Sequence, residues 1–516
     1  MRKFCLMVAI LLTLALVGSA AAQGDGVPQV VMLPMPDGVR LATDVYLPAG
    51  EGPFPVLLVR TPYSRATSAE LGAVTQALPV AIVIQDARGR YDSEGTFSVF
   101  QDAQADGHAT IEWITAQPWA SDQVSTLGGS ALGIAQYMLA PNAPEALNCQ
   151  WMTVGAPDLY AHVVATNGVF REELVQLWLE SLGEAHALDT MLSHAAEDAY
   201  WDAVRADFSA VNVPAVHIGG WYDIFARGTI DGFLGYQHEG GPDARGRQHL
   251  VMGPWTHDVD SLQVGELLFE DAASMSSDTY LEVWFQACLL GIDSAMQEFD
   301  ALPAVTYYTM GAVDEPDAPG NEWRTADDWP PPGGVDVPLY LHPNGYFSTD
   351  APATNGGSDT YIYDPGDPAP TIGGANLNLD AGVYDQRPVE VRDDVLVYST
   401  VPLPDPVEIT GDLRAELWVV ADVAETDVAV RLSDVYPDGR SMLILDSIAR
   451  FEGEPGQPGH LVFDLGPTSI MINAGHRLRV SITGANAPRF SPHPDAAQVT
   501  ILHDAGHPSM LVLPAR

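Results

Sequence analysis

Leu127-Gly128-Gly129-Ser130-Ala131-Leu132-Gly133 is the stretch of sequence that decides the fold of this chain. A β-rich segment, residues 124–127, leads into it, and a helix-forming segment, residues 131–139, leads out of it. A sharp strand-to-helix turn of this kind holds a serine side chain clear of the backbone, and only small neighbours let the chain bend so tightly. The turn also leaves the N–H of Ala131 at a helix N-terminus, where it can face an oxyanion. The spacing G-x-S-x-x-G departs from G-x-S-x-G, so taken alone it fits a glycine-rich structural corner equally well.

Two downstream strands end near polar residues that complete a catalytic set. Asp223 closes the loop after an apolar strand at residues 214–219, and His257 closes the loop after another at residues 249–253. Serine, aspartate, histidine is the chain order of α/β-hydrolases, in which each residue follows the carboxyl end of a strand. We therefore predict Ser130 as nucleophile, His257 as general base and Asp223 as the group that orients the imidazole. Singly, such an aspartate is usually a helix cap and such a histidine is structural, but the three together favour a triad.

Further landmarks are spread along most of the chain. They lie at residues 37–46, 60–63, 85–90, 93–95, 220–223, 253–257, 392–398, 434–440 and 475–480. With these segments and the serine turn, the sequence resembles the CocE/NonD hydrolases. That family includes cocaine-esterase-like enzymes, glutaryl-cephalosporin acylases, α-amino-acid ester hydrolases and Xaa-Pro dipeptidyl-peptidases.

The resemblance implies a serine hydrolase with Ser130, Asp223 and His257 as its triad. It also implies that the Tyr63 hydroxyl is an oxyanion-hole donor beside the Ala131 N–H. Pro62 would stiffen the turn that aims this hydroxyl, although the residues alone favour a half-buried aromatic at a strand end. Many relatives carry a tyrosine directly after the nucleophile where this chain has Ala131, so their acyl specificity does not carry over.

The pattern of strands and helices predicts the architecture of the first part of the chain. Predicted strands alternate with helical segments such as residues 105–116, and these strands lie at residues 56–59, 80–84, 124–127 and 152–154. A hairpin is predicted over residues 30–47. This alternation predicts a parallel sheet covered by helices on both faces. Residues 161–208 are helical in pattern, with Leu174, Leu177, Trp178 and Leu182 on one face. The sequence therefore predicts a catalytic domain at residues 27–160 and 209–332, interrupted by a helical cap insertion at residues 161–208.

The last part of the chain has a different pattern. A proline- and glycine-rich linker at residues 329–334 precedes many short strands separated by turn residues. The predicted strands lie at residues 339–341, 395–398, 407–410, 417–420, 428–432 and 478–483, and residues 350–374 are predicted to form a loop. This pattern predicts an all-β sandwich, a jelly roll, over residues 335–516. The fold class is therefore an α/β-hydrolase domain with a helical cap insertion, followed by an all-β jelly-roll domain.

Composition and charge limit the partners and the compartment. The 516 residues carry a formal net charge of −45, which disfavours nucleic acid and anionic membranes as partners. The first 22 residues have a charged start, an apolar run at 4–17 and small residues at 20–22, which predicts a cleaved signal peptide and a secreted or periplasmic protein. No later segment is apolar enough for stable membrane insertion. The oligomeric state is not indicated by the sequence.

The cysteines and the search for metal-ligand and cofactor motifs give little information about function. Cys149 and Cys288 lie in apolar segments, which favours two buried free thiols over a disulfide. No phosphate loop, dinucleotide fingerprint or clustered metal-ligand motif is present, so no cofactor and no metal site is predicted. Arg88, Arg90 and Glu94 are expected to form an ion-paired structural loop rather than a catalytic group.

These observations favour a secreted serine hydrolase that cleaves small acyl esters through an acyl-enzyme, with activated amides as a second class of substrate. The alternatives are an Xaa-Pro dipeptidyl-peptidase or another aminoacyl or acyl amide hydrolase, and a glycan-binding protein that kept the fold. In the amino-ester-hydrolase branch, acidic residues follow the triad aspartate shortly after it, where this chain has Ile224 and Phe225. An apolar acyl group is therefore expected, with Phe225 and Trp178 as candidate pocket residues. Trp201 is a further candidate, although lone aromatic residues on amphipathic helices, such as both of these tryptophans, are more often core residues.

Overall fold

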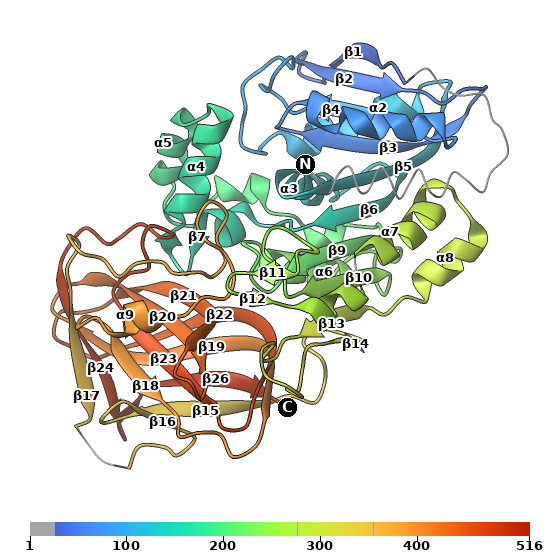
Figure 1. Cartoon of the computed structure of the whole chain (residues 1–516). Helices are drawn as coiled ribbons and strands as arrows, with labels where there is room; N and C mark the ends of the chain where they lie inside the picture. Colours follow the sequence, from blue (N-terminus) through green and yellow to red (C-terminus); the bar gives the residue numbers. More distant parts are fainter. Residues whose placement is uncertain (1–25, 276, 354–355) are drawn as a thin grey trace.

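The computed structural model describes residues 26–275, 277–353 and 356–516. The expected signal peptide lies outside these residues. Two parts pack against each other: a sheet covered by helices, and a β domain drawn in orange and red in Figure 1.

A ten-stranded sheet forms the first part, and its six parallel pairings run without interruption from β4 to β13. In spatial order its strands are β1 (Gln29–Pro34), β2 (Arg40–Tyr46), β4 (Ala81–Asp86), β3 (Phe54–Thr61), β5 (Ala120–Gly129), β6 (Leu147–Thr153), β9 (Ala215–Gly220), β10 (Gln248–Gly253), β13 (Val305–Thr309) and β14 (Glu322–Ala326). The expected hairpin at residues 30–47 is present as the antiparallel pair β1 and β2. Parallel strands place their carboxyl ends at one edge, so the loops after β3, β5, β9 and β10 open on the same side.

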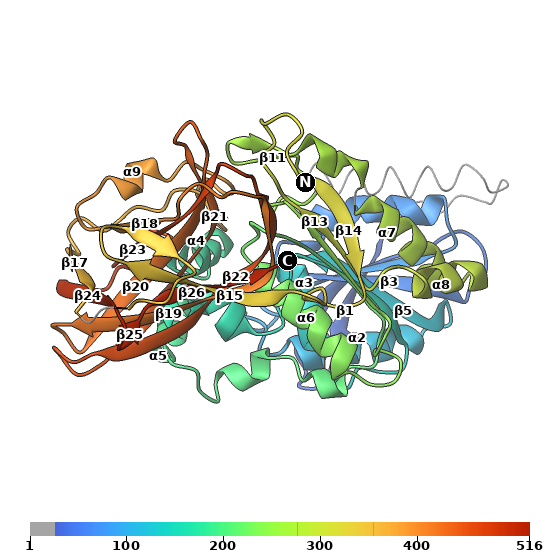
Figure 2. The same cartoon turned by 90° about the horizontal axis from the view of Figure 1, so that it is seen from below.

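Helices cover both faces of this sheet because its strands are apolar on both sides. In β3, Val56 and Leu58 belong to one buried cluster while Leu57 and Val59 belong to another. The first cluster includes side chains of α2 (Ala103–Thr115), α3 (Ala131–Leu139) and α6 (Ala226–His238). The second includes side chains of a 3₁₀ helix (Arg65–Gln76), α7 (Asp278–Trp284) and α8 (Asp293–Asp300). Figure 2 shows α2 and α7 on opposite sides of the strands.

Cys149 and Cys288 form a disulfide, so the expectation of two free thiols was wrong. Cys149 lies on β6 and Cys288 in a π-helical turn (Phe285–Leu289), with a Cα–Cα distance of 5.7 Å. The two residues are 139 positions apart. An apolar setting suits either state, and only the packing of this turn against the sheet brings the two sulfur atoms together.

The segment between β6 and β9 is helical in part. It contains a π-helical turn (Tyr160–Val164), a short hairpin of β7 (Ala165–Thr166) and β8 (Val169–Phe170), α4 (Glu172–Leu182), α5 (His186–Ser193) and short 3₁₀ turns (Trp201–Val204 and Phe208–Ala210). On α4, Leu174 and Leu182 are buried as expected, whereas Leu177 is 40% exposed. The buried face is instead completed by Val175 and Leu179. Apolar residue type alone did not indicate which of these neighbouring positions on α4 would be buried.

Strands make up almost all of the second part of the chain. Twelve described strands form one hydrogen-bonded network: β15 (Val335–His342), β16 (Tyr346–Ser348), β17 (Ser358–Tyr363), β18 (Leu396–Ser399), β19 (Val407–Ala421), β20 (Glu425–Val435), β21 (Ser441–Glu452), β22 (Gly459–Ile472), β23 (Arg477–Thr483), β24 (Ala497–Asp504), β25 (His507–Pro508) and β26 (Met510–Ala515). Short elements outside the two sheets are β11 (Gln263–Val264), β12 (Leu267–Leu268), a 3₁₀ helix (Glu270–Ser274) and α9 (Arg387–Glu390). This is the all-β jelly-roll domain that the sequence predicted.

Two expectations for this domain need correction. The strands expected at 407–410 and 417–420 are one strand, β19, because a register shift between Leu413 and Arg414 accommodates the irregular middle without ending the pairing with β22. The loop expected at 350–374 contains β17, an edge strand paired only with β24 among the described residues. Tertiary pairing overrides the turn-rich composition of this segment.

The two parts share one apolar core. A single buried cluster includes Trp221 and Tyr308 of the first part together with Leu417 and Val430 of the β domain. The Tyr222 hydroxyl donates a hydrogen bond of 3.0 Å to the Leu443 carbonyl oxygen of the β domain. The β domain therefore packs directly on the loop that carries Asp223.

Candidate active site

Ser130 lies in the turn between β5 and α3. Its φ of 58° and ψ of −125° are a strained combination for a residue with a side chain. Its N–H donates a hydrogen bond of 3.0 Å to the Thr153 carbonyl oxygen of β6, which fixes the turn against the sheet. A Cβ at Gly128 would lie 2.4 Å from the Cβ of Leu132, so glycine is needed for the helix to start here. Because α3 begins at Ala131, the N–H of Ala131 belongs to a first helical turn, whose N–H groups have no intrahelical acceptor.

Asp223 and His257 are brought together by the neighbouring strands β9 and β10. The Nδ1 atom of His257 lies 2.6 Å from Oδ1 of Asp223. The second carboxylate oxygen of Asp223 accepts a hydrogen bond of 3.0 Å from the Phe225 N–H. The Asp223 side chain is fully buried, whereas His257 is 18% exposed. This arrangement fixes the imidazole through Nδ1 and leaves Nε2 available for proton transfer.

Tyr63 follows β3, and its hydroxyl lies between the serine and the insertion. The phenol oxygen accepts a hydrogen bond of 2.9 Å from the indole Nε1–H of Trp178, and Tyr63 lines the same pocket as Ser130. Burial raises the pKa of Tyr63, and its interactions with Trp178 and Ser130 lower that pKa by less. The hydroxyl therefore keeps its proton at neutral pH and remains a donor.

An apolar pocket opens beside Ser130. Its lining comes from the catalytic sheet, the insertion and the β domain: Tyr63, Phe100, Ser130, Ala131, Ile134, Val163, Leu174, Val175, Trp178, Ile224, Phe225 and Leu377. Both expected pocket residues, Phe225 and Trp178, are among them. The Phe225 ring also packs edge-to-face on His257, with ring centres 5.7 Å apart. The free space is about 20 Å³, and no lining residue carries a charge.

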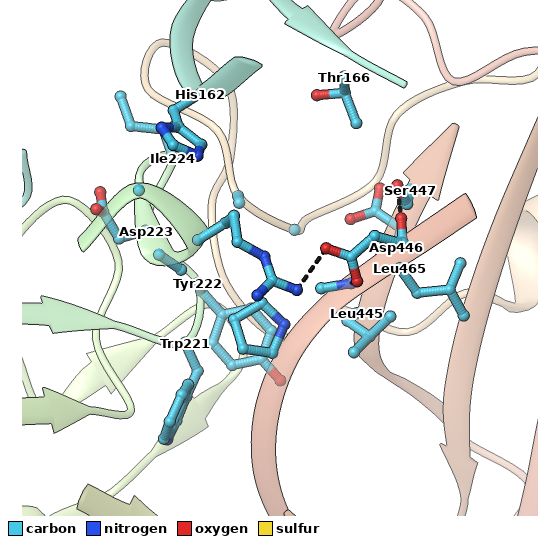
Figure 3. A pocket seen from close by; sticks show the side chains of 18 of the residues that line it. His162, Thr166, Trp221, Tyr222, Asp223, Ile224, Leu445, Asp446, Ser447 and Leu465 are labelled. Carbon is cyan, nitrogen blue, oxygen red and sulfur yellow. Dashed lines mark hydrogen bonds and ion pairs between the residues drawn. The ribbon is translucent and has the colours of Figure 1, made fainter. Parts of the chain in front are cut away.

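A larger cavity of about 160 Å³, whose lining includes several charged side chains, lies behind Asp223, between the first part of the chain and the β domain. Figure 3 shows Asp223 and Tyr222 on one side of it and Asp446 and Leu445 on the other. Arg171 is buried in its wall and donates a hydrogen bond of 2.9 Å to the Ile224 carbonyl oxygen. Burial lowers the pKa of Arg171 to about 9, so its guanidinium remains charged at neutral pH near Asp223.

Comparison with known proteins shows the family of this chain. The model of the X-Pro dipeptidyl-peptidase (S15 family) matches residues 37–187 and 176–258, and the model of the X-Pro dipeptidyl-peptidase C-terminal non-catalytic domain matches residues 297–512. Cocaine esterase of Rhodococcus sp. (strain MB1 Bresler) is 30% identical over 94% of this chain and 97% of its own length. The chain belongs to the CocE/NonD family. It is a serine hydrolase.

Solved structures share the fold of this CocE/NonD hydrolase. An α-amino acid ester hydrolase aligns with a TM-score of 0.81 at 23% identity, covering 97% of this chain and 98% of its own. An aminopeptidase from a marine sediment Thaumarchaeota archaeon aligns with a TM-score of 0.79 at 22% identity, covering 96% and 98%. The two-part architecture is thus that of the family along the whole described chain.

The structure also shows which of the two candidate tryptophans lines the pocket. Trp178 lines the pocket, whereas Trp201 is fully buried and packs against Tyr160 and Tyr200 in the insertion. Sequence reasoning missed the contributions of Phe100 and Leu377 to the pocket. These residues lie on loops far from the catalytic motifs, and no local pattern distinguishes them from other apolar loop residues.

The loop after β4 is ion-paired, as the sequence indicated. Arg88 bonds Asp106 at 2.5 Å and Asp37 at 2.6 Å, and Glu94 pairs with Arg40. None of Arg88, Arg90 and Glu94 lines the pocket beside Ser130. Among residues 26–275, 277–353 and 356–516, no group of three or more metal-binding side chains is found. Within the same residues, no helix is long and apolar enough to cross a membrane.

Proposed function

We propose that this chain is a secreted serine hydrolase that cleaves small acyl esters through a Ser130–His257–Asp223 triad and an acyl-enzyme intermediate. The observation that carries the proposal is the 2.6 Å contact between His257 and the buried Asp223, adjoining a pocket that contains Ser130. Tyr63 supports the proposal because its hydroxyl, whose pKa is raised by burial, lines the same pocket as Ser130.

The proposed reaction has two steps. The Ser130 Oγ attacks the ester carbonyl carbon while His257 Nε2 takes the Ser130 proton, and Asp223 stabilises the imidazolium. The Tyr63 hydroxyl and the Ala131 N–H donate to the oxyanion of the tetrahedral intermediate. As the intermediate collapses, His257 returns the proton to the departing alcohol. Water then attacks the acyl-enzyme by the same route, which releases the carboxylic acid and restores Ser130.

The pocket supports a short, uncharged acyl group. Its free space of about 20 Å³ is little more than one water molecule needs, and its lining is apolar apart from Ser130 and Tyr63. A charged group would be desolvated there without a partner of opposite charge. We therefore expect short aliphatic esters to be cleaved faster than long-chain or cationic ones.

Labelling with a fluorophosphonate probe tests the nucleophile. Only a serine activated by a neighbouring base reacts readily with this probe, so the native protein should be labelled and Ser130→Ala should not. Loss of a triad nucleophile typically lowers turnover on the order of a million-fold. Ser193→Ala, an exposed serine on α5, is the control and should label normally. Labelling of a folded Ser130→Ala protein would refute the assignment.

The alternative activity is removal of Xaa-Pro dipeptides, which the name of the matching family model suggests. Recognition of a free amino terminus requires a carboxylate close to the reacting serine, and the pocket beside Ser130 has none among its lining residues. A panel of acyl esters and Xaa-Pro anilides separates the two. Faster cleavage of the anilides would favour the peptidase.

Export belongs to the same proposal. Its support is the N-terminal pattern of residues 1–22 and the disulfide between Cys149 and Cys288, since disulfides persist mainly in oxidising compartments. The exported protein should begin near Gln23. Mass spectrometry of secreted or periplasmic protein that still carries residues 1–18 would contradict this.

A further inference from the structure

We propose that Trp178 is a positioning residue for Tyr63, so that the insertion sets one donor of the oxyanion hole. The observation is the 2.9 Å hydrogen bond from the Trp178 indole N–H to the Tyr63 phenol oxygen. This inference deepens the proposed function and depends on the role of Tyr63 in it.

The direction of this hydrogen bond determines where the Tyr63 proton points. An indole N–H can only donate, whereas a phenol hydroxyl has one proton to donate and lone pairs to accept with. Trp178 therefore occupies an acceptor position of Tyr63, and the proton of Tyr63 is directed elsewhere. Tyr63 and Ser130 line the same pocket, and the oxyanion would form there, beside the Tyr63 hydroxyl. Accepting a hydrogen bond also polarises the O–H bond and makes it a better donor.

Aromatic packing holds Trp178 in place. Its ring stacks on Phe100, with centres 6.0 Å apart and planes 4° from parallel, and meets the edge of Phe97 at 6.2 Å. Phenylalanine at position 178 would keep much of this packing and lose only the N–H and part of the ring area. The hydrogen bond can therefore be removed without emptying the site.

A second contact fixes α4 to the Tyr63 segment. Arg90 donates from Nε to the Pro62 carbonyl oxygen at 3.1 Å and forms an ion pair with Glu184, just after the C-terminus of α4. Arg90 and Glu184 are both largely buried, with side chains 8% and 14% exposed. The segment Pro62–Tyr63 is thus joined to the helix α4 region at two points, one through Arg90 and one through Trp178. Displacement of α4 would disturb the aim of the Tyr63 hydroxyl.

A different role for Trp178 would give different kinetics. If Trp178 only lines the acyl pocket, its substitution should mainly change KM, and the size of that change should depend on the acyl length of the substrate. As a positioning residue, it acts on charge that exists only in the transition state, so its loss should lower kcat by a similar factor for every acyl length.

The test is a double-mutant cycle with Trp178→Phe and Tyr63→Phe, measured as kcat and KM on acetyl to hexanoyl esters. We expect Trp178→Phe to lower kcat about three- to tenfold in the wild-type background, the size typical of one lost hydrogen bond. In the Tyr63→Phe background it should have no further effect, because the hydroxyl it positions is gone. Trp113→Phe on α2 controls for loss of an indole elsewhere and should leave kcat unchanged.

The remaining outcomes count against the inference. An equal loss in both backgrounds, or a loss that grows with acyl length, would make Trp178 only a pocket wall. An unchanged kcat in Trp178→Phe would show that the hydrogen bond between Trp178 and Tyr63 does not contribute to turnover. If Tyr63→Phe is too slow for steady-state assay, the fluorophosphonate labelling rate of Ser130 replaces kcat in the cycle. Wild-type kinetics of Tyr63→Phe itself would refute the oxyanion role, whereas absent labelling of the native protein would refute the proposed function.

Discussion

At the scale of single residues, the site is formed by short contacts between loops that follow neighbouring strands. Ser130 takes up its strained backbone because Gly128 leaves room for Leu132 and because the Ser130 N–H is held by β6. Asp223 is buried and bonded both to His257 and to the Phe225 N–H. These contacts hold each group in position before substrate arrives, which lowers the cost of reorganisation in the reaction.

Tyr63→Phe should lower kcat about a hundred- to a thousand-fold, or roughly 3 to 4 kcal/mol, because one oxyanion donor is lost. KM should change little, since the donor acts on charge that develops in the transition state. Steady-state kinetics on a short-chain ester check this, together with a thermal melt. Tyr160→Phe in the insertion is the matched control and should retain activity. Near-normal turnover in a folded Tyr63→Phe protein would leave Tyr63 as a core residue only.

At the scale of elements, the loop after β13 is joined to the β domain through a buried histidine. His476, directly before β23, lies 2.8 Å from an oxygen of Asp434 and 3.1 Å from an oxygen of Glu315, which is in the loop after β13. Burial by itself would lower the pKa of His476, but the hydrogen bonds and charges of the two carboxylates outweigh it and raise the pKa. The imidazolium form of His476 therefore stabilises the junction.

This pKa shift predicts a loss of stability at alkaline pH. A raised pKa in the folded protein gives stabilisation that is complete below the pKa of an unfolded histidine, about 6.5, and is lost as the pH rises through the higher folded value. The melting temperature of the native protein should therefore fall as the pH rises above about 6.5. His476→Gln should be less stable at pH 6 and should lack that part of the fall. Parallel pH profiles of the two proteins would contradict this.

At the scale of the whole molecule, three units meet at one pocket. The catalytic sheet supplies Ser130, the insertion supplies Trp178, and the β domain supplies Leu377. Glu173 of α4 also accepts a hydrogen bond from the N–H of Asn378 in the β domain. In the proposed reaction, substrate access would depend on the packing of all three units.

The disulfide joins two distant parts of the first unit and should add to overall stability. A cross-link that closes a loop of this length typically contributes about 2–5 kcal/mol, because it restricts the unfolded chain. The double variant Cys149→Ala/Cys288→Ala should unfold at a correspondingly lower denaturant concentration. Adding reductant to the native protein should cause a similar shift and leave the variant unchanged. Two titratable thiols in the unreduced, denatured protein would rule out the bond.

Much of this organisation could be predicted from the sequence because it depends on local patterns. The helix at residues 131–139 was expected over the residues that it occupies, since small residues before it and apolar residues within it agree. The position of Ser130, Asp223 and His257 after separate strands followed from strand periodicity and chain order. Phe225 could be expected in the pocket because it lies only two residues after Asp223.

By itself, the sequence determined the alternation of strands and helices, the change to an all-β domain after residue 334 and the order of the three polar residues, because each depends on neighbours in the chain. Only the tertiary structure decided that Cys149 meets Cys288, that Trp178 rather than Trp201 borders the pocket, and that the Tyr63 hydroxyl accepts a hydrogen bond from Trp178. These are contacts between segments far apart in sequence. Their partners are selected by the packing of whole elements, which residue type and spacing do not encode locally.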